Sequence, residues 1–582
     1  MTYKPPLDDY RYLYHEVFDV LQLNRFEAHA DLDEELIDFM TEAWGEFATE
    51  VWLPSNEYSD SIGCVMENGQ VKTPPGFIEA WKQTVEAGFL SSSCAGEWGG
   101  QDLPHFIRFA ADEIAVSTNM ALSAIGGLQI GVYELIFKHG SEELKQEYLP
   151  KITTGEWCGT MCLTEPQCGT DLKLITSRAV PSEDGSYIID GSKQFITGGD
   201  HDLTENIIHM VLARLPDAPA GIKGISLFLV PKLIEGEPNG VTCGGLEHKM
   251  GLKGSPTCVM NFDSAKGWLC GEPHTGMTAM FEMMNRERIG TGLMGLGLSE
   301  ISYQIARDYA FVRRQGRDLK GPQEPDEEAD RIIVHPDIRR TLLRAKALNE
   351  GCRALAVWAA LIYDKMECAE GEERVEAEEL FSLLTPVVKA YMTDAGFESA
   401  NECLQVLGGY GYISEYEIEK YVRDVRIGSI WEGTNSIQAL DLVGRKIPAQ
   451  MGKAMRRLIW PMQEFIAENR DDPEMAEFTK PLHQGLRGLQ QLTLLMMTEG
   501  LGNPWFTAAG ATEFARFLGN VVLGYMWARM ARVSLGREEE FHRAKVMTAR
   551  VFFQRVYPEN LALAAKVQAG DRALMMMEEG MF

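Results

Sequence analysis

The feature that most limits the possible folds is a strand-rich stretch at residues 160–278, which lies between two long regions of helical pattern. Within it, runs of β-branched and aromatic residues alternate with turn signals such as Asp184–Gly185 and Asp190–Gly191. Short strands separated by tight turns predict a small antiparallel β-domain, either a barrel or a sandwich. The clearest runs are Tyr187–Ile196, Ile207–Ala213, Ile225–Val230 and Thr257–Phe262.

The regions on either side predict helices. Apolar residues recur three and four positions apart before residue 160, where no strand pattern competes. Gly140 and Ser141 are expected to end one helix there and to cap the next. Helical periodicity returns after residue 278 and continues to the end of the chain. The predicted α+β fold has four domains: an N-terminal helical domain (1–159), the β-domain (160–278), a helical bundle (279–450) and an additional C-terminal helical domain (451–582).

Two apolar stripes in the last of these domains repeat at helical spacing. Stripes of this kind are more typical of a core or a subunit contact than of a ligand site. The first consists of Leu482, Leu486, Leu489, Leu492 and Met496, and the second of Phe514, Phe517, Val521, Val522 and Tyr525.

Charge and composition narrow the classes of function. The 582 residues are too many for one core, and the formal net charge of −30 is spread along the chain. An acidic surface repels phosphate backbones, so bulk nucleic-acid binding is disfavoured. The N-terminus lacks an apolar signal core and no transmembrane run is evident, so we expect a cytoplasmic protein. The 11 cysteines form no CxxC pair, which favours buried thiols over disulfides or a metal site.

One short stretch, Ile430–Gln438, carries an acid in an unusual setting. Glu432 lies between Trp431 and Gly433, and short hydrogen-bonding side chains follow at 434–436. Apolar neighbours disfavour a charged carboxylate, so Glu432 is suited to act as a base near neutral pH. The alternative is a surface glutamate at a loop-to-helix junction, where the Thr-Asn-Ser run caps the helix. The stretch by itself leaves both interpretations open.

Two further motifs are typical of sites that hold a flat ring or a phosphate. In Met161–Asp171, Gly169 lets the backbone approach a ligand, and Thr164 and Thr170 offer hydroxyl groups suited to a flavin edge or a phosphate. In Gln194–Gly199 a strand ends in an aromatic residue, a threonine and two glycines. Each motif is weak alone, because the first is equally compatible with a turn between strands.

Together, and in this order, these motifs resemble the acyl-CoA dehydrogenase family from about residue 100 to 450. The chain's first residues, the segment Gly245–Gly251 and the additional C-terminal helices are similar to the large members of that family. The density of matches favours the catalytic interpretation of Glu432. The resemblance is carried by His139–Lys151, Leu163–Asp171, Lys249–Thr257, Gln405–Gly411, Glu419–Arg426 and Trp431–Thr434.

The resemblance implies FAD as the cofactor, in a site that two subunits share. The positions that contact FAD from within one subunit are Met161, Leu163, Thr164, Gly169, Thr170, Phe195, Ile196 and Thr197. The positions that hold the FAD of a neighbouring subunit are Arg313, Gln315, Gln405, Gly408 and Gly409. Thr434 and Ser436 fall where the loop after the base touches the cofactor.

The resemblance also implies how the substrate is held. Arg288 matches an arginine close to the acyl-CoA, although this chain has Asn285 where many members have aspartate. Thr170, Trp431 and Gly433 are the other expected substrate contacts. Large members of the family act on varied thioesters, so both a fatty acyl-CoA and 3-methylmercaptopropionyl-CoA remain open as substrates.

The implied reaction is α,β-dehydrogenation of an acyl-CoA thioester to the trans-2-enoyl-CoA. In the family, the backbone N–H of the base and a ribityl hydroxyl of FAD polarise the thioester carbonyl. Glu432 would remove the α-proton while flavin N5 accepts the β-hydride. An electron-transfer flavoprotein is the implied electron acceptor. The shared flavin site implies a homo-oligomer, for which we expect a dimer.

Three other functions share parts of this pattern. An acyl-CoA oxidase would use the same base but pass electrons to oxygen. A nitroalkane oxidase is expected to carry aspartate where this chain has Glu432. A flavin-bearing relative that associates with nucleic acid is disfavoured by the charge of −30 and by the lack of a basic run in the C-terminal domain.

Overall fold

The computed structural model describes residues 3–582, which divide into two compact units. One unit is the continuous segment Glu42–Gly290. The other joins the N-terminal segment up to Thr41 with Thr291–Phe582. Helix α7 (Gly276–Val312) begins in the first unit and ends in the second. The fold is thus helical at both ends of the chain with a β-region between, as the sequence predicts.

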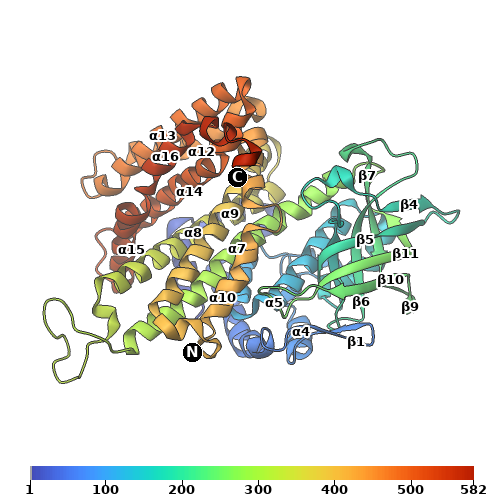
Figure 1. Ribbon diagram of the computed structural model, residues 1–582, viewed down its shortest axis with the longest axis horizontal. Helices are drawn as coiled ribbons and strands as arrows, with labels where there is room; N and C mark the ends of the chain where they lie inside the picture. The colour runs from blue at the N-terminus through green and yellow to red at the C-terminus, as the bar shows by residue number, and fades with distance from the viewer. Residues whose placement is uncertain (1–2) are drawn as a thin grey trace. The chain divides into compact units, whose positions relative to one another are not determined.

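The unit Glu42–Gly290 contains a seven-stranded sheet (Figure 1). The strands pair in the order β10-β11-β5-β4-β6-β3, and β7 pairs with both β6 and β11. Five of them, β11, β5, β4, β6 and β7, therefore form a closed ring, and the β-domain is a barrel rather than a sandwich. The strands are β3 (Trp157–Cys162), β4 (Arg178–Pro181), β5 (Tyr187–Thr197), β6 (Asn206–Arg214), β7 (Ile225–Pro231), β10 (Val241–Leu246) and β11 (Thr257–Leu269).

Two strand pairs correct the prediction of an antiparallel domain: β4 meets β6 in parallel at Arg178 and Arg214, and β3 and β6 form the longer parallel pair. Strands β3 and β6 run parallel, with pairs from Trp157–Asn206 to Cys162–Val211. Parallel neighbours need a long connection, and here the chain passes through β4 and β5 before β6 begins. Local sequence patterns show where strands lie but not which strands become neighbours.

A small hairpin corrects a second prediction, that no strands precede residue 160. Strand β1 (Val65–Glu67) pairs with β2 (Gln70–Lys72) across Asn68 and Gly69. Both turn residues have positive φ, at 52° and 78°, as a tight two-residue hairpin turn requires. The Asn-Gly pair was a usable signal, but three-residue strands that are mostly exposed carry no hydrophobic alternation.

Two apolar cores hold the barrel in place. Strand β6 is buried on both faces: Ile208 and Met210 pack outward, whereas Val211 and Ala213 face the barrel interior. The outward core is covered by α5 (His105–His139) and α6 (Glu142–Thr154). As predicted, Ser141 caps α6, its hydroxyl accepting the N–H of Leu144 at 3.3 Å. The loops at the strand ends are thereby fixed to a rigid scaffold.

Helix α5 is long and apolar enough to cross a membrane by length and composition alone. However, 78% of its most apolar window is buried inside the protein, and its side chains form much of the outward core of the β-domain. This helix therefore serves as a core helix. The thiols also match their prediction: all 11 cysteines are free, and most are buried.

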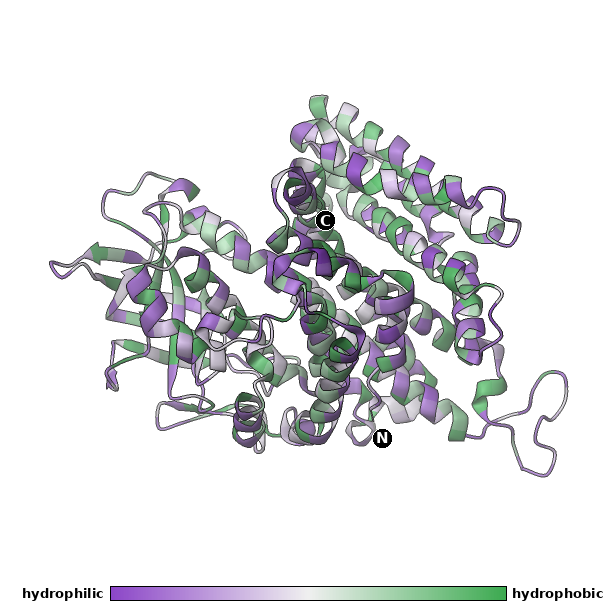
Figure 2. Cartoon of the chain, turned by 180° about the vertical axis from the view of Figure 1, so that it is seen from behind, coloured by the Kyte–Doolittle hydropathy of each residue, from purple (hydrophilic) through white to green (hydrophobic). Residues whose placement is uncertain are grey.

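The second unit is helical. Helix α14 is buried along most of its length, and α8, α9, α11, α13, α15 and α16 pack against it. Figure 2 shows hydrophilic and hydrophobic residues alternating along its outer helices. The bounds are α8 (Pro336–Cys368), α9 (Gly371–Val406), α10 (Ile418–Val425), α11 (Asn435–Asp441), α12 (Lys453–Glu468), α13 (Ala476–Gly502), α14 (Pro504–Ser534), α15 (Glu540–Val551), α16 (Glu559–Ala569) and α17 (Arg572–Met575).

Both predicted apolar stripes lie in the core of this unit. Every one of their ten side chains is buried, on α13 and α14 respectively. Helix α14 approaches α9 closely at Gly519, where an added Cβ would lie 2.1 Å from the Tyr391 ring. The Tyr391 hydroxyl also donates to the Asn520 side chain at 2.7 Å. The additional C-terminal helices thus buttress α9, which carries part of the candidate site.

The N-terminal segment joins this unit through buried ion pairs. Asp9 on α1 (Leu7–Arg11) accepts from Arg353 at 2.7 Å and from Lys545. Burial alone would raise the pKa of Asp9, but the Lys545 ammonium and the Arg353 guanidinium hold it well below its usual range. Three segments far apart in sequence are therefore joined by charge-assisted hydrogen bonds.

Candidate active site

The segment that contains Glu432 is a tight turn between Arg426–Ser429 and α11. Glu432 has φ of +55° and Gly433 has φ of +81°. The left-handed region is natural for glycine but unfavourable for glutamate, and such backbone conformations concentrate at functional sites. The Gln438 side chain donates to the Glu432 carbonyl at 2.9 Å, which holds the turn in this conformation.

A buried lysine from α9 supports the other side of the turn. Lys389 has no exposed surface, and its ammonium donates to the Gly433 carbonyl and to the Asn435 side chain, both at 2.7 Å. Asn435 in turn donates to Asp394 at 2.7 Å. Lys389 was not among the predicted site residues, although a lysine within the apolar run 387–391 was a usable signal.

The helix-cap interpretation of the Thr-Asn-Ser run is confirmed. The Thr434 hydroxyl accepts the N–H of Ile437 at 3.3 Å and caps α11, and it lies 2.9 Å from the Ser436 hydroxyl. The cap and the catalytic interpretation do not exclude each other, because the cap fixes where α11 begins. Glu432 is therefore held in place from both directions along the chain.

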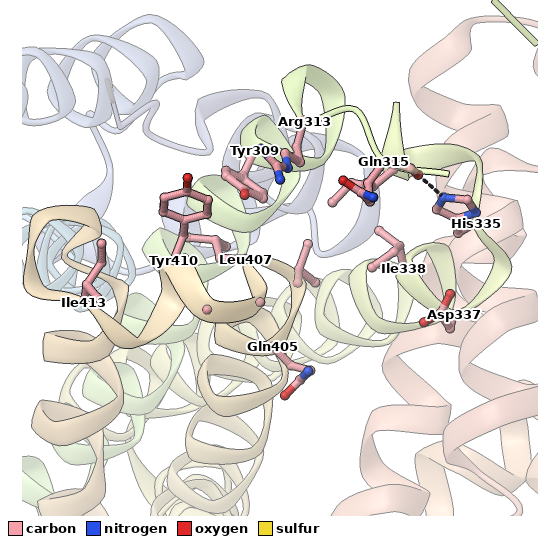
Figure 3. A pocket seen from close by; sticks show the side chains of 14 residues that line it. Tyr309, Arg313, Gln315, His335, Asp337, Ile338, Gln405, Leu407, Tyr410 and Ile413 are labelled. Atoms are coloured by element: carbon pink, nitrogen blue, oxygen red, sulfur yellow. Dashed lines mark hydrogen bonds between the residues drawn. The ribbon is translucent and has the colours of Figure 1, made fainter. Parts of the chain in front are cut away.

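The five residues expected to hold a neighbouring subunit's FAD line one cavity of about 640 Å³ (Figure 3). They come from chain segments about 90 residues apart, at the end of α7 and the end of α9. The five are Arg313, Gln315, Gln405, Gly408 and Gly409. Only the folded chain brings these two distant segments together at one cavity.

The cavity has room and chemistry for part of a dinucleotide. A Cβ added at Gly408 or Gly409 would meet nothing within 4 Å, and Gly408 has φ of +59°. The Arg313 guanidinium lies 5.6 Å from the centre of the Tyr410 ring. His335 donates to the Gln315 carbonyl at 2.7 Å. A cation, an aromatic face and open glycine backbone suit phosphate and ring groups, so these residues fit FAD.

The residues expected to contact FAD from within one subunit lie in the unit Glu42–Gly290. They lie at the end of β3, in the loop after it or at the end of β5, and the two segments are joined where the Gln194 N–H donates to the Thr164 carbonyl at 2.8 Å. The Leu163 and Ile196 side chains are buried, so only their backbone groups can face a ligand. Gly169 and Thr170 are exposed.

Phe195 is the most distinctive residue of this group. It has φ of +60°, unfavourable for an aromatic residue, and the residue is 57% exposed. An exposed ring at a strained strand end is suited to pack against a flat cofactor. It adjoins Ile196, which pairs with Cys258 in the sheet.

A buried ion pair fixes the loop between β3 and β4. The Glu165 carboxylate accepts from Lys193 at 2.9 Å, from the Ser177 hydroxyl at 2.6 Å and from the Thr176 N–H at 2.8 Å. Burial alone would raise the pKa of Glu165, but the Lys193 charge and these hydrogen bonds lower it to about 2. The predicted flavin loop is thus anchored to β5, which carries Lys193.

We expect Glu165→Gln to destabilise the protein by about 3–5 kcal/mol at pH 7, because it leaves the buried Lys193 charge without its partner. Because the pKa of Glu165 is lowered to about 2 in the folded state, the pair stabilises above the ordinary glutamate pKa of ~4.3 and loses its effect as pH falls toward 2. Urea unfolding at pH 7 and pH 3 should therefore give a smaller difference at pH 3. Glu183→Gln, at an exposed site in the same domain, is the control; an equal effect of both would contradict this role.

Arg288 on α7 contacts Asn285, a neutral residue. It is 6% exposed, and its guanidinium donates to the Asn285 side chain at 3.2 Å. An amide stands where many relatives have a carboxylate, and it orients the guanidinium through this hydrogen bond. A positive group held in this way is suited to an anionic part of a ligand.

Comparison with known proteins identifies the family. Residues 34–156, 160–265 and 274–447 match the models for the N-terminal, middle and C-terminal domains of acyl-CoA dehydrogenase. Residues 458–578 match the model described as acetyl-CoA dehydrogenase C-terminal like. Together these matches extend over most of the chain.

Two curated relatives and one solved structure agree with these matches. The chain is 38% identical to 3-methylmercaptopropionyl-CoA dehydrogenase of Ruegeria pomeroyi over 99% of both sequences. It is 34% identical to the broad-specificity linear acyl-CoA dehydrogenase FadE5 of Mycobacterium tuberculosis over 88% of both. An acyl-CoA dehydrogenase from Bacillus anthracis, solved with FAD, has the same fold (TM-score 0.76, 23% identity, 95% of this chain and 92% of that one). The chain therefore belongs to the acyl-CoA dehydrogenase family of FAD-dependent oxidoreductases.

Proposed function

We propose that this enzyme dehydrogenates an acyl-CoA thioester to the trans-2-enoyl-CoA, with Glu432 as the base that removes the α-proton. The observation that carries the proposal is the turn at Glu432, a glutamate with φ of +55° held through its own carbonyl and that of Gly433. A carboxylate base must be positioned to within a fraction of an ångström, and a turn fixed at both of its carbonyls supplies that precision.

The α-proton next to a thioester is too weakly acidic for an unaided carboxylate. We assign the backbone N–H of Glu432 as a donor to the thioester carbonyl, so that the hydrogen bond strengthens as negative charge develops on the oxygen. The left-handed turn supports this assignment, because the direction of that N–H is set by the strained φ of the base itself. When bound, FAD supplies the acceptor for the β-hydrogen as a hydride.

The cofactor is held by two groups of residues in this proposal. Arg313, Gln315, Gln405, Gly408 and Gly409 line the cavity for the FAD of a partner subunit. The loop after β3 and the end of β5, including Thr164 and Phe195, hold the FAD of their own subunit. Thr434 and Ser436, which follow the base in the chain, are inferred to touch the cofactor.

For the substrate we infer a linear acyl-CoA, either 3-methylmercaptopropionyl-CoA or a fatty acyl-CoA. The names of the relatives at 38% and 34% identity support these two classes. Arg288 would meet an anionic part of coenzyme A, and Thr170, Trp431 and Gly433 would border the acyl group. We further infer a cytoplasmic homodimer that passes its electrons to an electron-transfer flavoprotein.

A panel of thioesters tests the proposal. Anaerobic mixing of the yellow holoprotein with saturated acyl-CoAs should bleach the flavin and form 2-enoyl-CoA. The most informative pair is 3-methylmercaptopropionyl-CoA and pentanoyl-CoA. Their acyl chains have the same number of chain atoms, and a sulfur atom in the first replaces a methylene group of the second. Near the preferred chain length we expect bleaching rates to differ by roughly 10- to 200-fold between acyl chains that differ by one methylene, because pocket fit is worth about 1–3 kcal/mol per methylene.

Two outcomes would contradict the proposal. A holoprotein that dithionite bleaches but that no saturated acyl-CoA bleaches would not be an acyl-CoA dehydrogenase. Stoichiometric release of hydrogen peroxide during aerobic turnover would identify an acyl-CoA oxidase instead.

A further inference from the structure

The connection between α7 and α8 is an ordered loop that adjoins the cofactor cavity. In Figure 1 it projects at the lower left, and Figure 2 shows it as largely hydrophilic. Its base is closed by three backbone hydrogen bonds: Ile332 N–H to Arg313 carbonyl (2.8 Å), Gln315 N–H to Asp330 carbonyl (3.0 Å) and Asp330 N–H to Gly316 carbonyl (3.0 Å). The loop therefore leaves the fold after the cavity residue Gln315 and re-enters it at Asp330, where the chain is hydrogen-bonded to Gln315 and Gly316.

A single buried carboxylate organises the inside of this loop. The Asp330 side chain has no exposed surface. One of its oxygens accepts the N–H of Gln323 (3.0 Å) and of Glu324 (2.9 Å), and the other accepts the N–H of Asp318 (2.9 Å). The Asp318 N–H is the largest of the contributions that lower the pKa of Asp330 to about 2, so it stays ionised at neutral pH.

A second acid ties the two sides of the loop together. Glu324 pairs with Arg331 at 2.7 Å and also with Arg314. Arg314 follows the cavity residue Arg313, and Arg331 precedes the cavity residue Ile332. One carboxylate therefore links the two sides of the loop's base. Arg317 adds a hydrogen bond to the Glu324 carbonyl at 3.0 Å. Most of the charged groups near the loop's base are thus paired within the loop itself.

Residues at the base of the loop and just after it form one wall of the cavity. Arg313, Gln315, Ile332 and His335 all line it, and His335 donates to the Gln315 carbonyl. Figure 3 shows Gln315 between Arg313 and His335. Any movement of the loop's base would displace Gln315 and the backbone of Arg313. Ordering a long surface loop costs conformational entropy. A requirement for a rigid cavity wall explains why the loop is held so firmly.

We propose that Asp330 is a positioning residue for the cofactor, acting through Arg313 and Gln315, and that the loop from Gly316 to Ala329 holds this wall of the FAD site in place before the cofactor binds. The proposal rests on the function proposed for the cavity. It assigns a role to a segment whose sequence carries no recognisable cofactor motif. Asp330 itself does not line the cavity.

The test is Asp330→Asn in the full-length holoenzyme. Asparagine has nearly the same size as aspartate. Its NH₂ group, however, must face either the N–H of Asp318 or the two N–H groups of Gln323 and Glu324, so at least one buried donor loses its acceptor. We expect the Kd for FAD to rise by roughly tenfold or more. Hydrogen exchange of the loop should accelerate, while the unfolding midpoint of the apoprotein stays close to that of the parent.

Asp326→Asn is the matched control, because it makes the same chemical change at an exposed site in the same loop. It should leave the Kd for FAD unchanged. Glu324→Gln is a second variant in case Asp330→Asn folds poorly, and it should weaken FAD binding in the same direction. An unchanged Kd for FAD in both loop variants would overturn the proposal.

A double-mutant cycle distinguishes positioning from general destabilisation. Because Asp330 is proposed to act through both Arg313 and Gln315, Asp330→Asn should weaken FAD binding less in a Gln315→Ala background than in the parent. Fully additive effects would overturn the positioning role. If Arg313→Ala retains FAD like the parent, the function proposed for the cavity fails; if Arg313→Ala loses FAD and Asp330→Asn does not, only the inference about Asp330 fails.

Discussion

Glu432→Gln should keep the yellow flavin and slow its anaerobic bleaching by saturated acyl-CoAs by roughly 10²- to 10⁴-fold. Glutamine has nearly the same shape, so the turn held by Gln438 and Lys389 should persist. The amide cannot accept a proton at neutral pH, however, and the α-carbon would have no base. Stopped-flow absorbance of the bound flavin after anaerobic mixing measures the rate directly.

Two controls keep this result specific. Glu415→Gln makes the same change at an exposed site about 17 positions earlier in the same unit and should bleach like the parent. Chemical reduction with dithionite should bleach the flavin of Glu432→Gln at the rate seen for the parent. If Glu432→Gln retains rapid bleaching by acyl-CoA, Glu432 is not the base.

Arg313→Ala should raise the Kd for FAD by roughly 100-fold, so that the variant is purified largely without flavin. Removing a guanidinium that meets a phosphate typically costs about 1.5–3 kcal/mol for the hydrogen bond to a charged group, and loss of its stacking on Tyr410 adds to this. The ratio of flavin to protein after gel filtration, followed by titration with FAD, measures the effect.

Arg339→Ala is the control for charge alone. Arg339 is exposed in the first turn of α8 and does not line the cavity. It should retain FAD like the parent, because surface charges separated from a ligand by solvent contribute little. If Arg313→Ala holds FAD as tightly as Arg339→Ala, the cavity is not a cofactor site.

The general course of the chain could be predicted because hydrophobic periodicity is local. The stripes on α13 and α14 follow from helical spacing, and both are buried. Four strands of the sheet, β5, β6, β7 and β11, follow from β-branched runs and turn signals, whereas β3, β4 and β10 lie outside the predicted runs. The parallel β3–β6 pair could not be predicted, because the choice of neighbour depends on a crossover of the whole chain. The β1–β2 hairpin carried only its Asn-Gly turn as a signal.

The candidate site likewise has residues that the sequence predicts and supporting residues that it does not. The identity of Glu432 and of the five cavity residues came from ordered motifs that resemble a family, and the structure places those five around one cavity. The supports for these residues are long-range. Lys389 reaches the Glu432 turn from a helix about 40 positions earlier, and Asp330 acts through backbone N–H groups that no side-chain pattern reveals. Residues that position others leave little trace in local sequence.

The most direct test of the account is α-proton exchange, because it isolates the base from the redox step. An acyl-CoA with sulfur in place of the β-carbon has no β-hydrogen to lose, so only proton transfer at the α-carbon can occur. The holoenzyme and Glu432→Gln would each be incubated with this thioester in D₂O, and deuterium at the α-carbon followed by mass spectrometry. We predict steady incorporation with the parent and loss of roughly 10²-fold or more of that rate with the variant. Exchange by Glu432→Gln at the rate of the parent would contradict the assignment of Glu432 as the base.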